Sequence, residues 1–144
     1  MLTHTPLPNV DEPDFAPFWG GCREGMLLLP RCAAGHLNWP PRPACRECQA
    51  EIVDWIEVPG RGQLFSWTVV HRTRLQGFAD LTPYTVVIVA LEQDPSIRLL
   101  GRCVCAPSPL APGLPMEVVF VAAGENIVLP LWRPVSSGSI DTNE

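Results

Sequence analysis

The sequence predicts a mainly β protein: a small five-stranded barrel, preceded by one short helix and a small cysteine-rich ribbon. Three observations lead to this prediction. First, 17 of the 144 residues are proline, and proline interrupts long helices while it is tolerated in loops and at strand edges. Second, much of the second half alternates with the period of two that is typical of strands. Third, three cysteines and a histidine gather in one short stretch ahead of that half.

The composition excludes several classes of protein. Hydrophobic residues make up 47% of the chain and charged residues 17%, which allows a packed core and argues against disorder. No apolar run approaches the roughly 20 residues that a membrane-spanning helix needs. Residues 1–13 have no basic region followed by an apolar one, so no secretory signal is predicted. We therefore expect a cytoplasmic protein, and clustered cysteines in that reducing compartment favour metal binding over disulfides.

The first regular element expected is a helix over residues 14–24. Pro17 suits its first turn, and Asp11 or Asp14 is the predicted N-cap. One face of this helix is apolar, and its residues follow the helical spacing: Phe15, Phe18, Trp19 and Cys22. This face packs either on the body of the protein or against a partner.

Two short apolar runs, 26–29 and 55–58, flank the cysteine-rich segment and are predicted to be strands. Five further strands are expected, over residues 62–71, 84–92, 97–105, 116–121 and 127–132. Gly101 inside the third of these predicts a bulge or a barrel bend. Five short strands of this kind fit a partly open Greek-key barrel, the OB-fold, and the alternative is a generic small β-sandwich.

The spacing Cys32-x3-His36-x8-Cys45-x2-Cys48 predicts a metal site. Two residues between Cys45 and Cys48 allow both thiolates to reach one tetrahedral zinc ion at roughly 2.3 Å. The first half is irregular, because Gly35 stands where a second Cys-x2-Cys pair would have its cysteine. His36 is the nearest replacement, and neutral imidazole is a competent zinc ligand. The alternatives are buried thiols without metal, an iron site, or a redox-active pair.

Four motifs follow one another within residues 14–134: Phe18-Trp19-x4-Glu24-Gly25-x-Leu27, Arg31-Cys32, Trp39-Pro40-Pro41-Arg42-x2-Cys45-x2-Cys48 and Gly60-x-Gly62-x2-Phe65-Ser66-x-Thr68. As a set they resemble the family called domain of unknown function 35. Members combine a rubredoxin-like zinc ribbon with an acyl-CoA-associated OB-fold. The resemblance implies four parts: a lead-in with the helix, the ribbon, the OB-fold and a flexible tail, at 1–25, 26–56, 57–134 and 135–144.

The resemblance also implies a function. Members of this family are similar to accessory subunits that bridge or stabilise thiolase-fold enzymes, including lipid-transfer-protein-like aldolases, and hydratases acting on acyl-CoA. It implies zinc as the cofactor, a hetero-oligomer with such an enzyme, and an OB-fold that docks the partner and contacts CoA. On this basis we expect a non-catalytic subunit.

The residues themselves agree with a non-catalytic role. His71 is the only histidine in the predicted barrel, and the sequence has neither a Gly-x-Ser-x-Gly nucleophile elbow nor a phosphate-binding glycine loop. Cys103 and Cys105, which alternate along one predicted strand, are interpreted as small core residues.

Two groups of residues are candidates for contact with other molecules. Arginine suits phosphate geometry, so the candidates for contact with CoA or a partner are His71, Arg72, Arg74 and Arg102. The alternative for these residues is a solvated loop. The candidates for partner docking are Phe15, Phe18 and Trp19, since exposed aromatic patches mark interfaces. The proline-rich loop 106–115 is either partner surface or self-packed.

The main competing function is nucleic-acid binding, because aromatic side chains on OB-fold strands can stack on bases. Phe65, Trp67 and Tyr84 are the candidate residues. A net charge of −5 and a pI near 5.1 argue against this function, since polyanion binding depends on neutralising phosphates. We therefore expect neither nucleic acid nor a membrane as partner. A rubredoxin-like electron carrier is the third interpretation, and the missing fourth cysteine argues against it.

Overall fold

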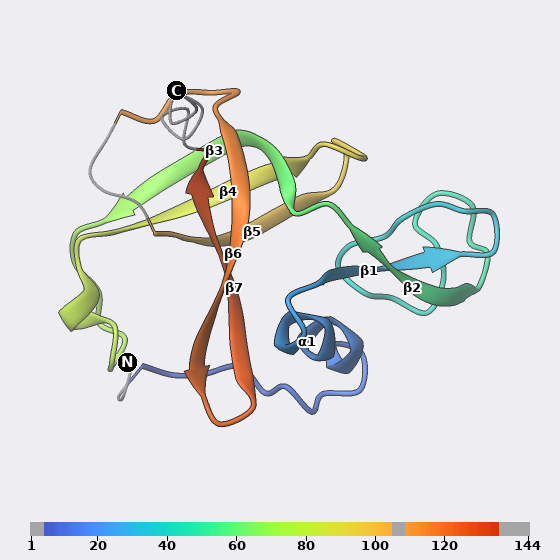
Figure 1. Ribbon diagram of the computed structural model, residues 1–144, viewed down its shortest axis with the longest axis horizontal. Coiled ribbons are helices and arrows are strands. Elements are labelled where there is room, and N and C mark those ends of the chain that lie inside the picture. The colour runs from blue at the N-terminus through green and yellow to red at the C-terminus, as the bar shows by residue number, and fades with distance from the viewer. Residues whose placement is uncertain (1–4, 105–108, 136–144) are drawn as a thin grey trace, which may run out of the picture.

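The computed structural model describes residues 5–104 and 109–135, and their architecture confirms the predicted fold class (Figure 1). A helix is followed by a two-stranded sheet and a closed five-stranded barrel. The elements, in chain order, are α1 (Ala16–Arg23), β1 (Leu27–Cys32), β2 (Ile52–Val58), β3 (Arg61–Val70), the 3-10 helix η1 (Ala79–Leu81), β4 (Tyr84–Leu91), β5 (Arg98–Cys103), β6 (Pro115–Gly124) and β7 (Ile127–Pro134).

The barrel closes in the order β3-β4-β5-β7-β6, and the start of β3 pairs with β6. Every pairing is antiparallel except that of β5 with β7, which is parallel and consists of the single pair Cys103 and Trp132. The sheet therefore returns upon itself, and the alternative of a β-sandwich is wrong. No helix within the described residues is long and apolar enough to cross a membrane.

Helix α1 is shorter than predicted and begins without the expected aspartate cap. Phe15 occupies the N-cap position and no side chain bonds to the first turn, while Pro17 lies in that turn as predicted. The backbone N–H groups of Phe15 and Ala16 both donate to the Glu12 carbonyl, at 2.9 and 2.8 Å. Because the preceding turn already supplies this acceptor, neither Asp11 nor Asp14 is needed as the cap.

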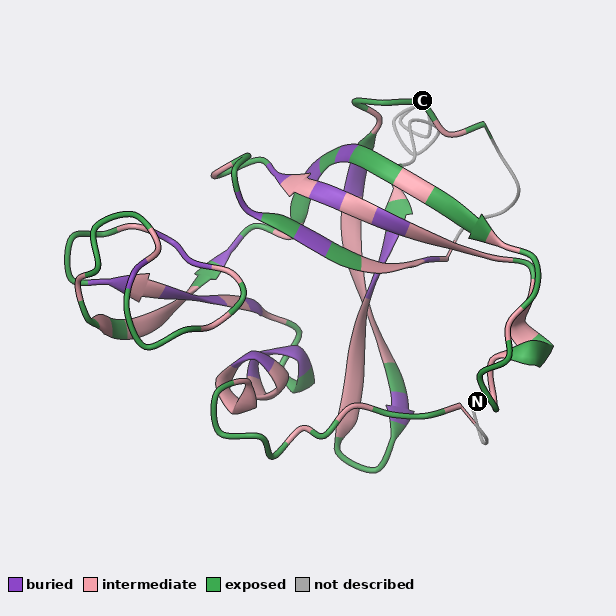
Figure 2. Cartoon of the chain, turned by 180° about the vertical axis from the view of Figure 1, so that it is seen from behind, coloured by how far each residue is buried: buried purple, intermediate pink, exposed green. Residues whose placement is uncertain are grey.

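A glycine ends α1 and turns the chain into β1. Gly25 has φ of +74°, a conformation that costs glycine little. Its N–H donates to the Cys22 carbonyl at 3.0 Å, and the next N–H, of Met26, donates to Gly21 at 2.8 Å. The strand β1 then continues through Pro30, beyond its predicted end, and β2 begins earlier than predicted. Figures 1 and 2 show that α1 lies between the barrel and this two-stranded sheet.

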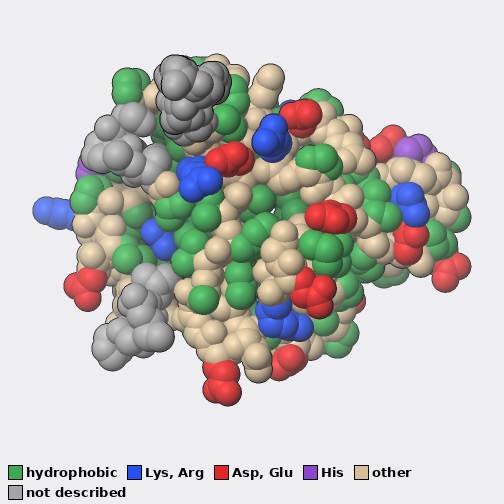
Figure 3. Space-filling model, in the orientation of Figure 1, with side chains coloured by type: hydrophobic (Ala, Val, Ile, Leu, Met, Phe, Trp, Pro, Cys, Tyr) green, Lys and Arg blue, Asp and Glu red, His purple; other side chains and the backbone are tan. Residues whose placement is uncertain are grey.

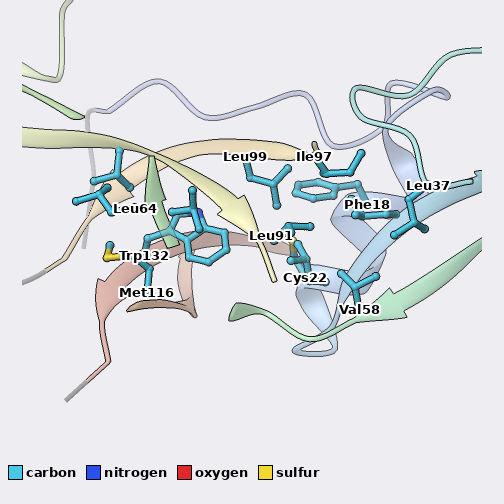
Figure 4. Packing of buried hydrophobic residues seen from close by; sticks show 14 of the residues in the cluster. Phe18, Cys22, Leu37, Val58, Leu64, Leu91, Ile97, Leu99, Met116 and Trp132 are labelled. Carbon is cyan, nitrogen blue, oxygen red and sulfur yellow. The ribbon is translucent and has the colours of Figure 1, made fainter. Parts of the chain in front are cut away.

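One hydrophobic core joins the helix, the ribbon and the barrel (Figure 4). Leu64, Met116 and Trp132 fill the barrel and are at most 1% exposed. Phe18 of α1 and Leu37 of the ribbon belong to the same cluster. The ribbon is therefore packed onto the barrel through α1 rather than joined to it only by a linker.

The strict alternation predicted for residues 62–71 is interrupted by a bulge in β3. The pairing of β3 with β4 shifts register between Leu64 and Ser66. One extra residue moves the following side chains to the opposite face, so Trp67, rather than Ser66, packs against the core. Phe65 is left 49% exposed, and the guanidinium carbon of Arg98 lies 3.8 Å from its ring centre.

Of the two alternatives predicted for Gly101, a bulge or a barrel bend, the bulge is absent, because β4 and β5 stay in register through this residue. The glycine is needed instead for close packing. A Cβ at this position would lie 2.8 Å from Cδ1 and 3.1 Å from Nε1 of Trp132. Cys103, near the end of β5, is buried as predicted. Cys105 and residues 106–108 of the predicted loop lie outside the described residues, as does nearly all of the predicted tail 135–144.

Replacing this glycine tests the packing. We expect Gly101→Ala to lower the free energy of unfolding by about 1–3 kcal/mol, because the added methyl group overpacks the core. Gly20→Ala is the matched control: its Cβ would meet only Arg23, at 3.6 Å, and alanine raises helix stability by about 1 kcal/mol. Urea unfolding of both variants measures the difference. Equal stability of Gly101→Ala and wild type would contradict the described packing.

Candidate metal centre

The ribbon places its candidate metal ligands in two tight turns. The first turn follows β1: the Gly35 N–H donates to the Cys32 carbonyl at 2.9 Å, and the Cys32 N–H donates to the His36 carbonyl at 3.0 Å. Gly35 has φ of +95°, which explains why glycine stands at this position. In the second turn the Cys45 N–H donates to the Ala50 carbonyl at 2.8 Å. Both turns lie at the same end of the two-stranded sheet.

The structure brings all four predicted ligands together. The ligand atoms of Cys32, His36, Cys45 and Cys48 all lie within 4.8 Å of one another. Cys32 Sγ is 3.6 Å from His36 Nδ1 and 3.8 Å from Cys48 Sγ, and Cys45 Sγ is 3.7 Å from His36 Nδ1. Around a tetrahedral zinc ion with bonds of roughly 2.3 Å, ligand atoms are about 3.8 Å apart. The cluster therefore has the size of a zinc site.

Hydrogen bonds from the backbone favour thiolates in this cluster. The His36 N–H donates to Cys32 Sγ and the Glu47 N–H to Cys45 Sγ, each at 3.3 Å. Burial opposes ionisation of Cys45, but bonds from the Asn38 side chain and from the Cys48 and Glu47 backbone outweigh it and lower its pKa to about 6. Since the thiolate is the form that binds metal, these bonds prepare the site for a cation.

The other three ligands of the cluster respond to similar contacts. The Ala50 backbone bond favours the Cys48 thiolate, but burial and contacts with Cys32 and Cys45 leave its pKa above the ordinary value. Burial opposes ionisation of Cys32 as well, yet the backbone bonds of His36 and Ala34 leave its pKa below the ordinary value. Contacts with Cys45 and Cys32 raise the pKa of His36. By contrast, Cys22 is buried in the apolar core and lies outside the cluster, and this burial raises its pKa to about 12.

The donor set fits zinc and does not fit a four-sulfur iron site. Three sulfurs and one imidazole form a closed set of four, the usual arrangement of structural zinc. A rubredoxin-type iron site needs a fourth cysteine, and no other cysteine among the described residues joins the cluster. When bound, zinc would hold the two turns together. A closed site leaves no position for a water or substrate ligand, so its chemistry is structural.

Asn38 supports the centre, and sequence analysis did not identify it. Its side chain is fully buried. Its Oδ1 accepts the Arg46 N–H at 2.8 Å, and its Nδ2 donates to the His36 carbonyl at 3.4 Å. The amide thus connects the first turn to the second. The only signal in the sequence was a polar residue between Leu37 and Trp39, which is too common to single out.

Removing this amide should weaken the centre. We expect Asn38→Leu to lower the free energy of unfolding by about 1–3 kcal/mol, since it leaves the part-buried Arg46 backbone N–H without its partner, and to speed zinc release. Thermal unfolding and the rate of zinc transfer to a colorimetric chelator measure the two effects. Gln63→Leu, at an exposed position of β3, is the control. Unchanged zinc release in Asn38→Leu would show that the amide does not support the metal centre.

The structure separates the four residues that were grouped as candidate contacts. Arg72 and Arg74 line one pocket of about 480 Å³, next to the exposed His71 beyond the end of β3. Arg102 lies on β5 and lines a different, apolar groove. The Arg72–Arg74 pair is therefore the candidate for binding phosphate, without Arg102.

The predicted docking face is partly buried. Phe18 is only 6% exposed, and its ring centre lies 4.7 Å from that of Trp39. It cannot be a surface anchor, because the ribbon covers it. Phe15 and Trp19 are half-buried, and they line the same apolar groove as Arg102.

The candidate aromatic residues do not form a platform for bases. Trp67 packs against the core, Phe65 stacks with Arg98, and Tyr84 pairs with Phe78 at 5.9 Å between ring centres. On the face in Figure 3, acidic and basic side chains are interspersed and form no continuous basic area.

Fold and site together define a protein with a zinc ribbon joined to an OB-fold, and comparisons with known families agree. Residues 19–54 match the family described as "ChsH2, rubredoxin-like zinc ribbon domain", and residues 55–121 match "ChsH2, C-terminal OB-fold domain". A DUF35 domain-containing scaffold protein of Pyrococcus furiosus is 31% identical over 103 residues, which cover 71% of this chain and 74% of the relative. The chain belongs to the DUF35/ChsH2 family, as its motifs predicted.

Two further similar proteins are a longer relative and a chain of a solved aldolase structure. A probable enoyl-CoA hydratase alpha subunit of Thermomonospora curvata is 31% identical over 131 residues, 90% of this chain. The chain spans only 40% of that relative's length. Among solved structures, the Ltp2-ChsH2(DUF35) aldolase contains a chain that is 30% identical, with a TM-score of 0.76. The match covers 91% of this chain and 99% of that one.

Proposed function

We propose that this protein is a non-catalytic accessory subunit that binds and stabilises a thiolase-fold aldolase or a hydratase acting on acyl-CoA thioesters. The observation that carries the proposal is the match to 99% of a chain of the Ltp2-ChsH2(DUF35) aldolase. The whole length of that DUF35 chain thus has a counterpart here. The relationship to part of a hydratase alpha subunit supports the second kind of partner.

The geometry of the described residues supports a non-catalytic role. The candidate metal centre has no open position for substrate, since four protein ligands complete it. His71 is exposed beyond the end of β3 and makes no hydrogen bond within the described part of the chain. His71 is therefore not held against a nucleophile in the way that acyl-transfer catalysis requires.

Contact with CoA is the finer part of the proposal and rests on Arg72 and Arg74. Both line the same pocket, together with Thr73, Ala79 and Thr82. One guanidinium group can donate two parallel hydrogen bonds to the oxygens of one phosphate. CoA carries a diphosphate and a 3′-phosphate. In the assembled enzyme this pocket would receive the phosphates of the thioester substrate.

Co-expression tests the proposal. The Ltp2-type aldolase and the hydratase subunits of the same genome are each produced with and without this protein. We expect one of these enzymes to elute with it in size-exclusion chromatography and to gain stability and activity. The isolated protein should turn over no acyl-CoA substrate. If all proteins elute separately and each enzyme is stable and fully active alone, the proposed function is wrong.

A further inference from the structure

We propose that an apolar groove between α1 and the barrel is the docking site for the partner enzyme, and that it receives an apolar side chain flanked by acidic groups. The groove has a volume of about 340 Å³ and is formed by residues of α1, the ribbon, β5 and β7. This inference rests on the proposed function, because it names the surface through which the subunit binds its enzyme.

The groove exists because β5 and β7 join at only one point. Cys103 pairs with Trp132, and the Val104 N–H donates to the Trp132 carbonyl at 2.7 Å. Pro130 has no N–H with which to extend this ladder. Side chains of α1 occupy part of the opening, and the remainder is the groove.

The walls of the groove have the composition of a binding hot spot. Trp19, Trp39 and Trp132 contribute to the lining, and Arg102 is its only charged residue within the described part of the chain. Tryptophan and arginine are the residue types most enriched among those that dominate interface energies. An apolar side chain inserted here would be surrounded by aromatic rings and would exclude water from them.

The apolar surface continues beyond the rim, which favours a protein partner over a small molecule. Leu100 lines the groove yet remains 69% exposed. A small ligand would be enclosed by the cavity and would leave this side chain in water. A protein surface would cover the groove and Leu100 together, as the apolar centre of an interface is covered.

The positive charge on β5 indicates the charge expected on the partner surface. Alternate residues of a strand share a face, so Arg98, Leu100 and Arg102 point outward together. Neither arginine forms an ion pair with another described residue. Arg98 stacks on Phe65, but both arginines keep a positive charge that no described acidic group neutralises. In a chain with a net charge of −5, a leucine between two such cations is complementary to an apolar side chain with acidic groups beside it.

Point variants of the full-length protein test the inference against the enzyme that co-elutes with it. We expect Leu100→Asp and Arg102→Glu each to raise the Kd at least about tenfold, mainly through faster dissociation. The matched controls are Val53→Asp, at a 57% exposed position of β2, and Arg61→Glu, at an exposed position of β3. Both controls should bind within about twofold of wild type. Because all four positions face solvent at least in part, circular dichroism should show unchanged folding.

A photo-crosslinker placed at position 100 supplies the second measurement. We expect it to react with the partner enzyme, and a charge-reversing change of an acidic residue at the reacted site should restore binding of Arg102→Glu. Normal binding of Leu100→Asp and Arg102→Glu would show that the groove is not the docking site, while the proposed accessory function would stand. Crosslinks only to a second copy of this chain would also rule out the groove as that docking site. Failure of the wild-type protein to bind either enzyme would overturn both proposals.

Discussion

Removing the metal is expected to unfold the ribbon while the barrel stays folded. Two strands alone are marginally stable in water, and structural zinc supplies an apparent free energy of about 10–16 kcal/mol in small zinc domains. The barrel has its own core of Leu64, Met116 and Trp132 and should survive. Metal analysis should give about one zinc per chain. After chelation, amide NMR signals from the segment 32–52 should collapse while those of β3 to β7 stay dispersed.

Point variants distinguish the effect of losing the metal from the effect of damaging the hydrophobic core. Cys48→Ser removes an exposed ligand and should reproduce the chelated spectrum. Cys22→Ala removes a buried cysteine outside the cluster and should retain zinc. His36→Ala should reduce zinc affinity, because it leaves three ligands. A folded, metal-free wild-type protein with an intact ribbon spectrum would refute the prediction, and full zinc affinity in His36→Ala would remove His36 from the ligand set.

Trp132→Ala is expected to destabilise the barrel by about 3–5 kcal/mol, the usual cost of truncating a buried tryptophan. Its side chain is 1% exposed, and it lies on the strand that closes the barrel against β5. A domain of this size is stable by about 5–15 kcal/mol, so the variant should lose a large share of its stability. Urea unfolding followed by circular dichroism measures the change.

The half-buried Trp55 of β2 provides a control of the same residue type. Trp55→Ala should cost less than half as much, because much of its side chain is already in contact with water. Trp132→Phe should recover most of the lost stability, since it refills the largest part of the cavity. A loss below about 1 kcal/mol in Trp132→Ala would show that this ring does not organise the core.

Periodicity in the sequence predicted which segments are strands, but it did not predict how they pair. Burial follows the period-two pattern from Arg61 to Leu64, before the bulge, but not at the end of β3, where Val69 is exposed and Val70 is half-buried. The bulge between Leu64 and Ser66 depends on the register with β4, which is a long-range property. Gly101 shows the same limit: a mid-strand glycine suggested a bulge, whereas the ring of Trp132, distant in sequence, determines why glycine is needed.

The metal ligands were predictable because their spacing is local. His36 could be chosen over other candidates since it follows Cys32 within one turn. The buried partners were not predictable, because Asn38 acquires its role only when Arg46 is brought next to it. Likewise, the apolar face of α1 indicates that other side chains must cover this helix, but it does not indicate which segment supplies them. The ribbon covers Phe18, and the more exposed Trp19 is left at the groove.

Trp39 gives the metal centre an influence on assembly. This residue follows Asn38 in the first turn, contacts Phe15 and Phe18 through its ring, and forms one wall of the groove. A chain without metal would release this turn and present a groove with one wall displaced. If the enzyme docks in this groove, its recruitment would discriminate between metal-loaded and empty subunits, and the ribbon would serve as a checkpoint on maturation.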